Sequence, residues 1–249
     1  MSALLLLEAV TKKFGGVAAL NGVSIDAPQG SITGVIGPNG AGKTTLFNVI
    51  TGACRPTSGE VRLRGRSLNG LAPHEIARLG VARTFQNIRL FRSMTVWEHL
   101  MVGQRSDGGL IGALLPAGIA RAKAVRRAER ALELFGLQAH RHRLAATLPY
   151  GLQRKVEMAR ALTSEPELLL LDEPVAGMNH DEAGVLRELI QRLREGGLTV
   201  LLIEHDMPFV MNLCDRLFVL DFGSLIACGA PHEVRRDPLV LEAYLGSEA

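Results

Sequence analysis

GPNGAGKT, at residues 37–44, is the stretch that decides the fold, and it contains Gly37, Pro38, Asn39, Gly40, Ala41, Gly42, Lys43 and Thr44. It matches the phosphate-loop pattern G-x-x-x-x-G-K-[ST], whose glycines let successive backbone N–H groups point toward phosphate oxygens. Lys43 supplies a point charge for the β- and γ-phosphates of a nucleoside triphosphate, and the hydroxyl of Thr44 is suited to Mg²⁺. The dinucleotide fingerprint G-x-G-x-x-G does not fit, because Thr45 occupies the place of its third glycine.

A strand before this loop and a helix after it are expected. Ile32–Ile36 is a short apolar run, and Lys43–Thr51 has a helical pattern, so that a helix dipole adds to phosphate binding. Farther out, strands are expected at Leu4–Val10, Ser24–Asp26, Glu60–Arg64, Leu168–Leu171, Leu198–Ile203 and Leu217–Leu220, and helices at Asp181–Arg194 and Met207–Cys214. Apolar strands that alternate with helices predict an α/β fold whose mainly parallel sheet is covered on both faces.

The middle of the chain, from about residue 96 to 162, is rich in Ala, Arg, Leu and Glu and has helical periodicity. Ala124–Phe135 is amphipathic and is followed by Gly136, a typical helix stop. Apolar residues three and four apart predict another helix, and they are Leu152, Val156, Ala159 and Leu162. This middle is therefore predicted to be a helical insertion in the α/β fold.

Composition argues against several other classes of protein. The 249 residues are 47% hydrophobic, and the net charge of +3 is too small to indicate a nucleic-acid partner. Cationic side chains gather at Arg121–Arg130, which is either a solvated helix face or a surface that contacts phosphates or headgroups. The three cysteines lack zinc-ligand spacing. Leu110–Ala120 is too short to span a bilayer, and Met1–Val10 lacks the features of a secretory signal.

Two acids, Asp172 and Glu173, follow the predicted strand Leu168–Leu171. The carboxyl end of a strand in a parallel sheet faces the ligand crevice. There Asp172 can hold Mg²⁺ through its water shell, and Glu173 can orient and polarise an attacking water. Because adjacent residues of a strand point to opposite sides, we expect the two carboxylates to take different roles.

Further landmarks follow in a fixed order. Gln86 ends the sequence RTFQ, residues 148–155 read LPYGLQRK at the start of a helix, and His205 lies in the sequence IEHD after a strand. Together with the phosphate loop and the two acids, this order resembles the nucleotide-binding domain of ABC transporters over essentially the whole chain. Each piece alone is weak, whereas the combination is highly specific.

The resemblance implies a single ATPase domain over residues 1–249. Its α/β core, residues 1–86 and 163–249, would carry an antiparallel β subdomain, and a helical subdomain would cover about 87–162. Two such domains would pair head to tail with two ATP molecules between them. Each ATP would be held by the phosphate loop of one chain and the signature segment of the other.

The resemblance also implies roles for single residues. Glu173 matches the catalytic glutamate, His205 the switch histidine that contacts the γ-phosphate, and Gln86 the glutamine that touches Mg²⁺ or the attacking water. Phe14 matches the aromatic residue that stacks on adenine, and Asn179 replaces the more usual Asp in the loop that contacts the partner domain. The residues expected to hold Mg²⁺ are Thr44, Gln86 and Asp172.

The signature segment departs from the family's common L-S-G-G-Q and reads Leu148, Pro149, Tyr150, Gly151 and Leu152. The family's serine donates a hydroxyl hydrogen bond to the γ-phosphate of the partner's ATP, and Pro149 has neither a hydroxyl nor an N–H. Gly151 and the helix N-terminus remain. We therefore expect weakened anion binding here, two unequal ATP sites, and a partner ATPase that is not a second copy of this chain.

Finer features resemble the LivG-type subunits of branched-chain amino-acid importers: GVARTFQ at 80–86, Tyr150, AGMN at 176–179, IEHDM at 203–207, AYLG at 243–246, and a Gly/Ala-rich insertion near 107–120. This implies an ATPase on the inner, cytoplasmic face of the cell membrane. Its partners would be two membrane permease subunits, a LivF-type ATPase subunit or a second copy, and indirectly a solute-binding protein. ATPases for urea, short-amide or other amino-acid uptake, or for lipopolysaccharide export, share parts of this pattern.

Rival classes fit less well. A soluble ABC ATPase of translation or DNA repair usually fuses two nucleotide domains or carries a coiled-coil insertion, and neither is present here. A phosphate-loop kinase or GTPase would lack the series of Gln86, signature segment and His205, and a GTPase would show N-K-x-D. Glu173 argues against a binder without catalytic activity.

Overall fold

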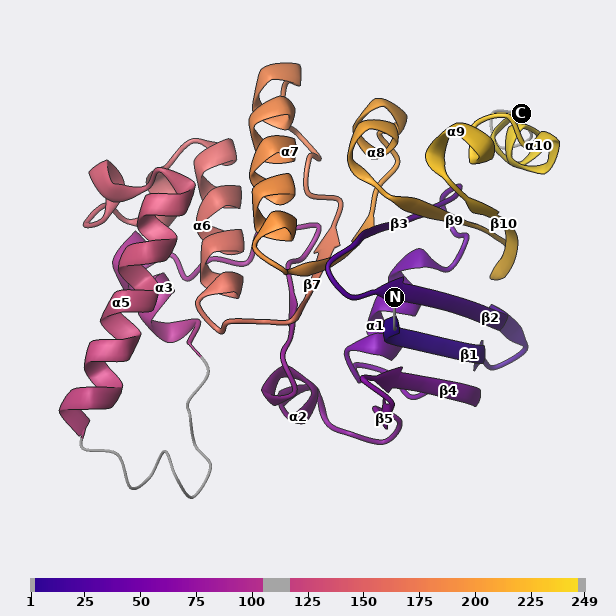
Figure 1. The fold of residues 1–249 in the computed structure, drawn as a ribbon, viewed down its shortest axis with the longest axis horizontal. Coiled ribbons are helices and arrows are strands. Elements are labelled where there is room, and N and C mark those ends of the chain that lie inside the picture. Colours follow the sequence, from indigo (N-terminus) through magenta and orange to yellow (C-terminus); the bar gives the residue numbers. More distant parts are fainter. Residues whose placement is uncertain (1–2, 105–116, 246–249) are drawn as a thin grey trace.

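The sheet that carries the phosphate loop has six strands in the order β10-β9-β3-β8-β7-β6. The strands are β3 (Ile32–Ile36), β6 (Val81–Arg83), β7 (Leu168–Asp172), β8 (Thr199–Ile203), β9 (Arg216–Asp221) and β10 (Ser224–Gly229). All neighbouring pairs are parallel except β9 and β10. The computed structural model describes residues 3–104 and 117–245 (Figure 1). The predicted α/β fold with a mainly parallel sheet is confirmed.

A second, antiparallel sheet lies beside the first (Figure 1). Its order is β2-β1-β4-β5, and its strands are β1 (Ala3–Phe14), β2 (Val17–Pro28), β4 (Ser58–Leu63) and β5 (Arg66–Ser67). Helix α1 (Lys43–Ile50) shares its hydrophobic core, as do Leu170 of β7 and Leu201 of β8. This sheet is the antiparallel β subdomain that the family resemblance implied.

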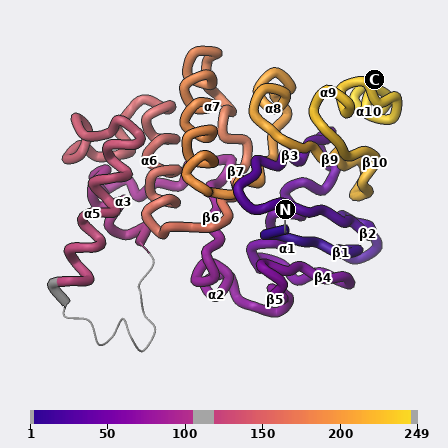
Figure 2. The backbone as a smooth tube through the Cα atoms, viewed as in Figure 1, coloured from indigo at the N-terminus to yellow at the C-terminus, as the bar shows by residue number. Residues whose placement is uncertain are grey.

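Helices cover the other face of the parallel sheet and continue beyond its β6 edge (Figures 1 and 2). The longer ones are α3 (Val96–Val102), α5 (Ala117–Phe135), α6 (Tyr150–Leu162), α7 (His180–Glu195), α8 (Met207–Leu213) and α10 (Pro238–Leu245). The short ones are α2 (Pro73–Arg78), α9 (Pro231–Val234) and the 3-10 turns η1 (Gln138–His140) and η2 (Ala145–Thr147). Because alternate residues of a strand face opposite sides, Leu169 of β7 and Leu202 of β8 pack in the core of these helices.

The strands and helices expected from the sequence are all present, and β1, β2 and α5 are longer than predicted. Gly136, with φ of +64°, follows the last residue of α5 as expected. The helical insertion is confirmed for α3, α5 and α6. Most of the Gly/Ala-rich insertion near 107–120, and Gly246, lie outside the described residues.

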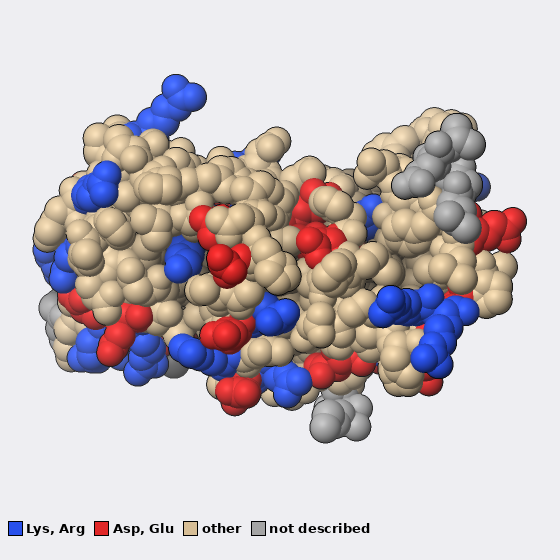
Figure 3. All heavy atoms as spheres, turned by 90° about the horizontal axis from the view of Figure 1, so that it is seen from above, with Lys and Arg blue, Asp and Glu red and all other residues tan. Residues whose placement is uncertain are grey.

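Neither a membrane-spanning helix nor a broad basic surface is seen among the residues that the structure describes. Within residues 3–104 and 117–245, no helix has the length and apolar character needed to cross a membrane. Seen from above, Lys and Arg side chains are interspersed with Asp and Glu, and other residues cover most of that face (Figure 3). That face therefore shows no continuous basic surface among the residues described.

Candidate functional site

The phosphate loop connects β3 to α1 and is packed closely on both sides. Gly37 has φ of +148°, and a Cβ there would lie 2.0 Å from the backbone oxygen of Leu220 in β9. Gly42, the N-cap of α1, has φ of +100°, and a Cβ there would lie 2.3 Å from the backbone oxygen of Ala19 in β2. A side chain at either position would push against backbone. Both sheets therefore hold the loop in place.

The side chain of Lys43 lies inside this loop. Its Nζ donates hydrogen bonds to the carbonyl oxygens of Gly37 at 2.7 Å and Pro38 at 2.8 Å. Burial lowers the pKa of Lys43, and the negative charges of Glu173 and Asp172 oppose that shift. The two acids predicted from the sequence are therefore close to the ammonium group.

The other residues of the loop differ in exposure. Ala41 is buried, and its N–H donates to the carbonyl oxygen of Pro38 at 3.2 Å, which tightens the turn. Thr45 is half-buried. Three residues of the loop are exposed and could be approached by a phosphate group: Asn39, Gly40 and Thr44.

Asp172, the last residue of β7, is held by an arginine that the sequence analysis did not single out. Arg83 of β6 donates to Asp172 Oδ2 at 2.7 Å and to Asn48 Oδ1 at 2.7 Å. The side chains of this ion pair are only 9% and 6% exposed. Within the described residues the other oxygen of Asp172, Oδ1, has no hydrogen bond or ion pair, so it can face a cation.

Three predicted residues meet beside Asp172. Gln86 Nε2 donates to Glu173 Oε2 at 2.8 Å, and His205 Nδ1 lies 3.6 Å from the same oxygen. Gln86 follows β6, Glu173 follows β7 and His205 follows β8. A carboxylate held in this way can accept a proton from water while its neighbours orient the water.

The backbone of Glu173 does not continue β7. Its φ is +47°, in the left-handed region that costs a residue with a Cβ about 1–2 kcal/mol. Hydrogen bonds hold it there, because its N–H donates to Ile203 at 2.9 Å and its carbonyl accepts from Ala176 at 3.2 Å. The expectation that strand alternation separates Asp172 and Glu173 is therefore wrong, and the turn after β7 sets the direction of Glu173.

A buried carboxylate that the sequence analysis passed over, Glu204, fixes the loop that carries His205. Its Oε2 accepts from the N–H groups of His205 at 3.0 Å and Asp206 at 3.2 Å, and its Oε1 accepts from Val175 at 3.1 Å. Burial raises the pKa of Glu204, and these N–H groups oppose the rise. Glu204 thus ties the turn after β7 to the turn after β8.

Phe14 is exposed at the end of the β1–β2 hairpin. The residue is 53% exposed, and Lys12 Nζ lies 4.8 Å from the centroid of its ring. The same hairpin touches the phosphate loop, since Gly42 approaches Ala19 of β2. The position suits an aromatic platform for a base, because an exposed ring can stack on a base with the face that Lys12 does not cover.

The signature segment is divided between core and surface. Leu148 is 3% exposed and belongs to the core of the helices, and Leu152 packs partly against the same core. Pro149 is the N-cap of α6, and Pro149 and Tyr150 are exposed. A Cβ at Gly151 would lie 2.9 Å from a carboxylate oxygen of α7. Any contact with a partner's ATP would therefore be made by the backbone of the signature segment and by residues 149–151.

Asn179 begins α7 as its N-cap. Its Oδ1 accepts from the N–H of Glu182 at 2.9 Å, and Glu182 Oε2 accepts from the N–H of Asn179 at 3.0 Å. Asn caps helices as well as Asp does, so the replacement of the usual Asp keeps this helix start intact. The loop before it touches the signature segment, because a Cβ on Gly177 would lie 3.2 Å from the ring of Tyr150.

Arg154, in α6, is a further residue that the sequence analysis missed, and its side chain is fully buried. Nη1 donates to the carbonyl of Phe85 at 2.6 Å and to Glu157 Oε2 at 3.0 Å. Nη2 donates to the carbonyl of Gln86 at 2.8 Å and to Tyr150 Oη at 3.1 Å. One guanidinium thus connects the backbone of Gln86 with the signature segment.

A loop that cradles phosphates, a strand-end acid pair and a separate signature helix on one chain define an ATP-binding cassette. Residues 20–176 match the family described as ABC transporter, and residues 224–249 match the family described as branched-chain amino acid ATP-binding cassette transporter. The chain belongs to the ABC transporter family, as one of its ATP-hydrolysing cassettes.

Several curated relatives are similar over nearly the whole length. The branched-chain amino acid transport ATP-binding protein LivG of Salmonella typhimurium is 47% identical, with 98% of each chain covered. LivG of Escherichia coli is 46% identical and BraF of Pseudomonas aeruginosa 44% identical, again with 98% of each chain covered.

Solved structures agree with the fold. A nucleotide-free ATP-binding cassette from an ABC transporter has a TM-score of 0.87 and 34% identity, and the match covers 98% of this chain and 99% of that one. The ADP conformation of an ATP-binding cassette of an ABC transporter also has a TM-score of 0.87, with 33% identity over 99% of this chain and 100% of that one.

Proposed function

We propose that this chain is the ATP-hydrolysing subunit of an importer for branched-chain amino acids. The names of the relatives and the match of residues 224–249 support this solute. The partners would be two membrane permease subunits, a second ATPase subunit and a solute-binding protein outside the membrane. The chain would lie on the cytoplasmic face of the membrane, and its segment 87–162 would serve as a helical subdomain.

The observation that carries the catalytic proposal is the meeting of Gln86, Glu173 and His205 at the carboxyl ends of β6, β7 and β8, with the charge of Glu173 acting on Lys43. Lys43 and the loop N–H groups bind the phosphates. The positive charge of Lys43 also stabilises the negative charge that develops on the γ-phosphate during its transfer. Glu173 orients the attacking water and takes its proton. Gln86 holds Glu173 and the water, His205 contacts the γ-phosphate, and the ring of Phe14 supports the adenine.

The oxygen donors at the site fit Mg²⁺. Thr44 is an exposed residue with a hydroxyl, Oδ1 of Asp172 has no other bond among the described residues, and Gln86 offers an amide oxygen. A single carboxylate suits Mg²⁺, which keeps waters and binds phosphates rather than a full protein cage. When bound there, Mg²⁺ would neutralise phosphate charge; Thr44, Gln86 and Asp172 would hold it, Asp172 through the water shell of the ion.

The two ATP sites of the complex are expected to be unequal because of Pro149. In the reconstituted complex, Lys43→Ala should reduce ATP turnover roughly 100-fold, since it removes a charge on the transferring phosphate. The same change in the phosphate loop of the second ATPase should reduce ATP turnover less. That site is closed by the signature segment with Pro149 and is expected to contribute less turnover from the start. Turnover of each single variant is the measurement. Equal losses would contradict the proposed inequality.

The proposed solute is tested with the complete complex in proteoliposomes. We expect ATP turnover to rise when the binding protein is loaded with leucine, isoleucine or valine, because the solute-loaded form engages the permease. The same protein loaded with urea or a short amide is the control. Stimulation by urea alone would refute the solute assignment and leave the ATPase assignment standing.

A further inference from the structure

A groove of about 720 Å³ lies at the edge of the parallel sheet opposite the phosphate loop. It is lined by the segments that enter β7 and β8, at residues 165–167 and 196–198, whereas the phosphate loop follows the carboxyl end of β3. Because these strands are parallel, their amino and carboxyl ends lie at opposite edges. The groove is therefore separate from the ATP site.

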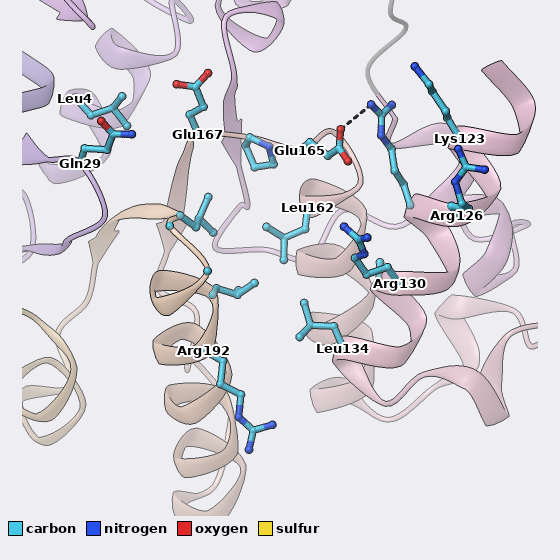
Figure 4. Close-up of a pocket in the computed structure, with 17 residues that line it drawn as sticks. Leu4, Gln29, Lys123, Arg126, Arg130, Leu134, Leu162, Glu165, Glu167 and Arg192 are labelled. Atoms are coloured by element: carbon cyan, nitrogen blue, oxygen red, sulfur yellow. Dashed lines mark ion pairs between the residues drawn. The ribbon is translucent and has the colours of Figure 1, made fainter. Parts of the chain in front are cut away.

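Helix α5 forms one wall of the groove and the end of α7 the other (Figure 4). The α5 wall carries Lys123, Arg126, Arg127 and Arg130, and Arg192 lies on the α7 side. Apolar side chains complete the lining: Leu134 lies on the α5 wall, Leu193 on the α7 wall, and Leu4, Leu162 and Leu198 on the segments between them. The arginine cluster noted in the sequence is thus one wall of a cavity, not a helix face surrounded by solvent alone.

Both acids of the groove are already paired. Glu165 forms an ion pair with Arg127 at 2.6 Å, drawn as a dashed line in Figure 4. Glu167 forms an ion pair with Arg64 at 2.9 Å. Among the described residues, no ion pair or hydrogen bond is formed by the side chains of Lys123, Arg126 and Arg130. The groove therefore has an excess of positive charge.

The unpaired cations are spread along one side of α5. Lys123, Arg126 and Arg130 are three and four residues apart, which places them on the same helix face. Seven residues of helix span about 10 Å, so a single small anionic group cannot reach all three. Ligands with several anionic groups can do so, and guanidinium groups match phosphate and carboxylate geometry.

We propose that this groove binds a small organic polyanion, with an apolar or aromatic body and two or more phosphate, sulfonate or carboxylate groups. The charged groups face the α5 cations and Arg192, and the body lies on the leucine lining. The volume is within the roughly 300–1,000 Å³ typical of small-molecule sites. An occupant of this groove would touch both α5 and α7.

The test uses pyranine, a fluorescent pyrene with three sulfonates, and the full chain with its phosphate loop saturated by Mg-ADP. Fluorescence anisotropy should show saturable binding that weakens as salt is raised. The variant Arg126→Glu/Arg130→Glu should weaken the Kd about tenfold or more, because two attractions become repulsions. Both side chains are exposed, so the variant should keep its melting temperature.

The matched control is Arg235→Glu/Arg236→Glu, which changes the net charge equally on exposed residues after α9, at the other end of the molecule (Figure 1). It should weaken the Kd by less than about twofold, since distant surface charges are screened. Equal loss in both variants, or no saturable binding by the wild-type chain, would overturn the proposal. Binding only to phosphatidylglycerol vesicles would overturn it in favour of a lipid surface.

Discussion

Replacement of Glu173 by glutamine is expected to lower ATP turnover roughly 100-fold or more, the range lost when a general base is removed. Glutamine has the same shape and can keep the contact with Gln86, but it cannot take the proton of the attacking water. ATP affinity should be retained, because the phosphate loop is unchanged and one negative charge near the phosphates is removed. Single-turnover hydrolysis and nucleotide-binding titrations on the reconstituted complex measure the two effects separately.

Glu165→Gln is a matched control for this substitution. Glu165 is also a glutamate in the left-handed region, with φ of +49°, and it lies at the opposite edge of the sheet. Its replacement removes a carboxylate at a position with the same backbone conformation but outside the ATP site, and we expect normal hydrolysis. If Glu173→Gln hydrolysed ATP normally, the assignment of Glu173 as the base would be wrong.

The parallel sheet could be predicted because its strands are buried on both faces. Ile32–Ile36, Leu168–Asp172 and Thr199–Ile203 are buried at every residue, so nearly every position had to be apolar and the runs stand out. The shorter elements gave no such signal. Val81–Arg83 has three residues and Arg66–Ser67 two, too few to show any period.

Site residues that belong to a sequence motif could be predicted. Residues that reach the site only through contacts between distant segments could not. Arg83 and Glu204 stand next to predicted segments, but only the pairing of β6 with β7 brings Arg83 to Asp172. The positive φ of Glu173 likewise depends on its bond to Ile203, 30 positions later. Side-chain direction at this turn therefore had no signal in the local sequence.

The substitution Arg154→Met should destabilise the protein by about 3–5 kcal/mol, the cost of removing one partner from a buried ion pair. It leaves the carboxylate of Glu157, only 1% exposed, without its cation, and it leaves the carbonyls of Phe85 and Gln86 without a donor. Burial already raises the pKa of Glu157, and the charge of Arg154 opposes that rise. Urea denaturation of the full chain measures the loss.

A variant that lacks both charges distinguishes the effect of the ion pair on stability from the effect of side-chain packing. Arg154→Met/Glu157→Leu should be more stable than Arg154→Met alone, because no unpaired charge stays in the core. Arg192→Met is the control for an exposed helical pair, since Arg192 lies 4.0 Å from Glu188 and both are largely exposed; we expect a change below about 0.5 kcal/mol. A double variant no more stable than Arg154→Met would show that Glu157 does not need its cation. In that case the importance of Arg154 would rest on the two carbonyls, and thus on the link between Gln86 and the signature helix.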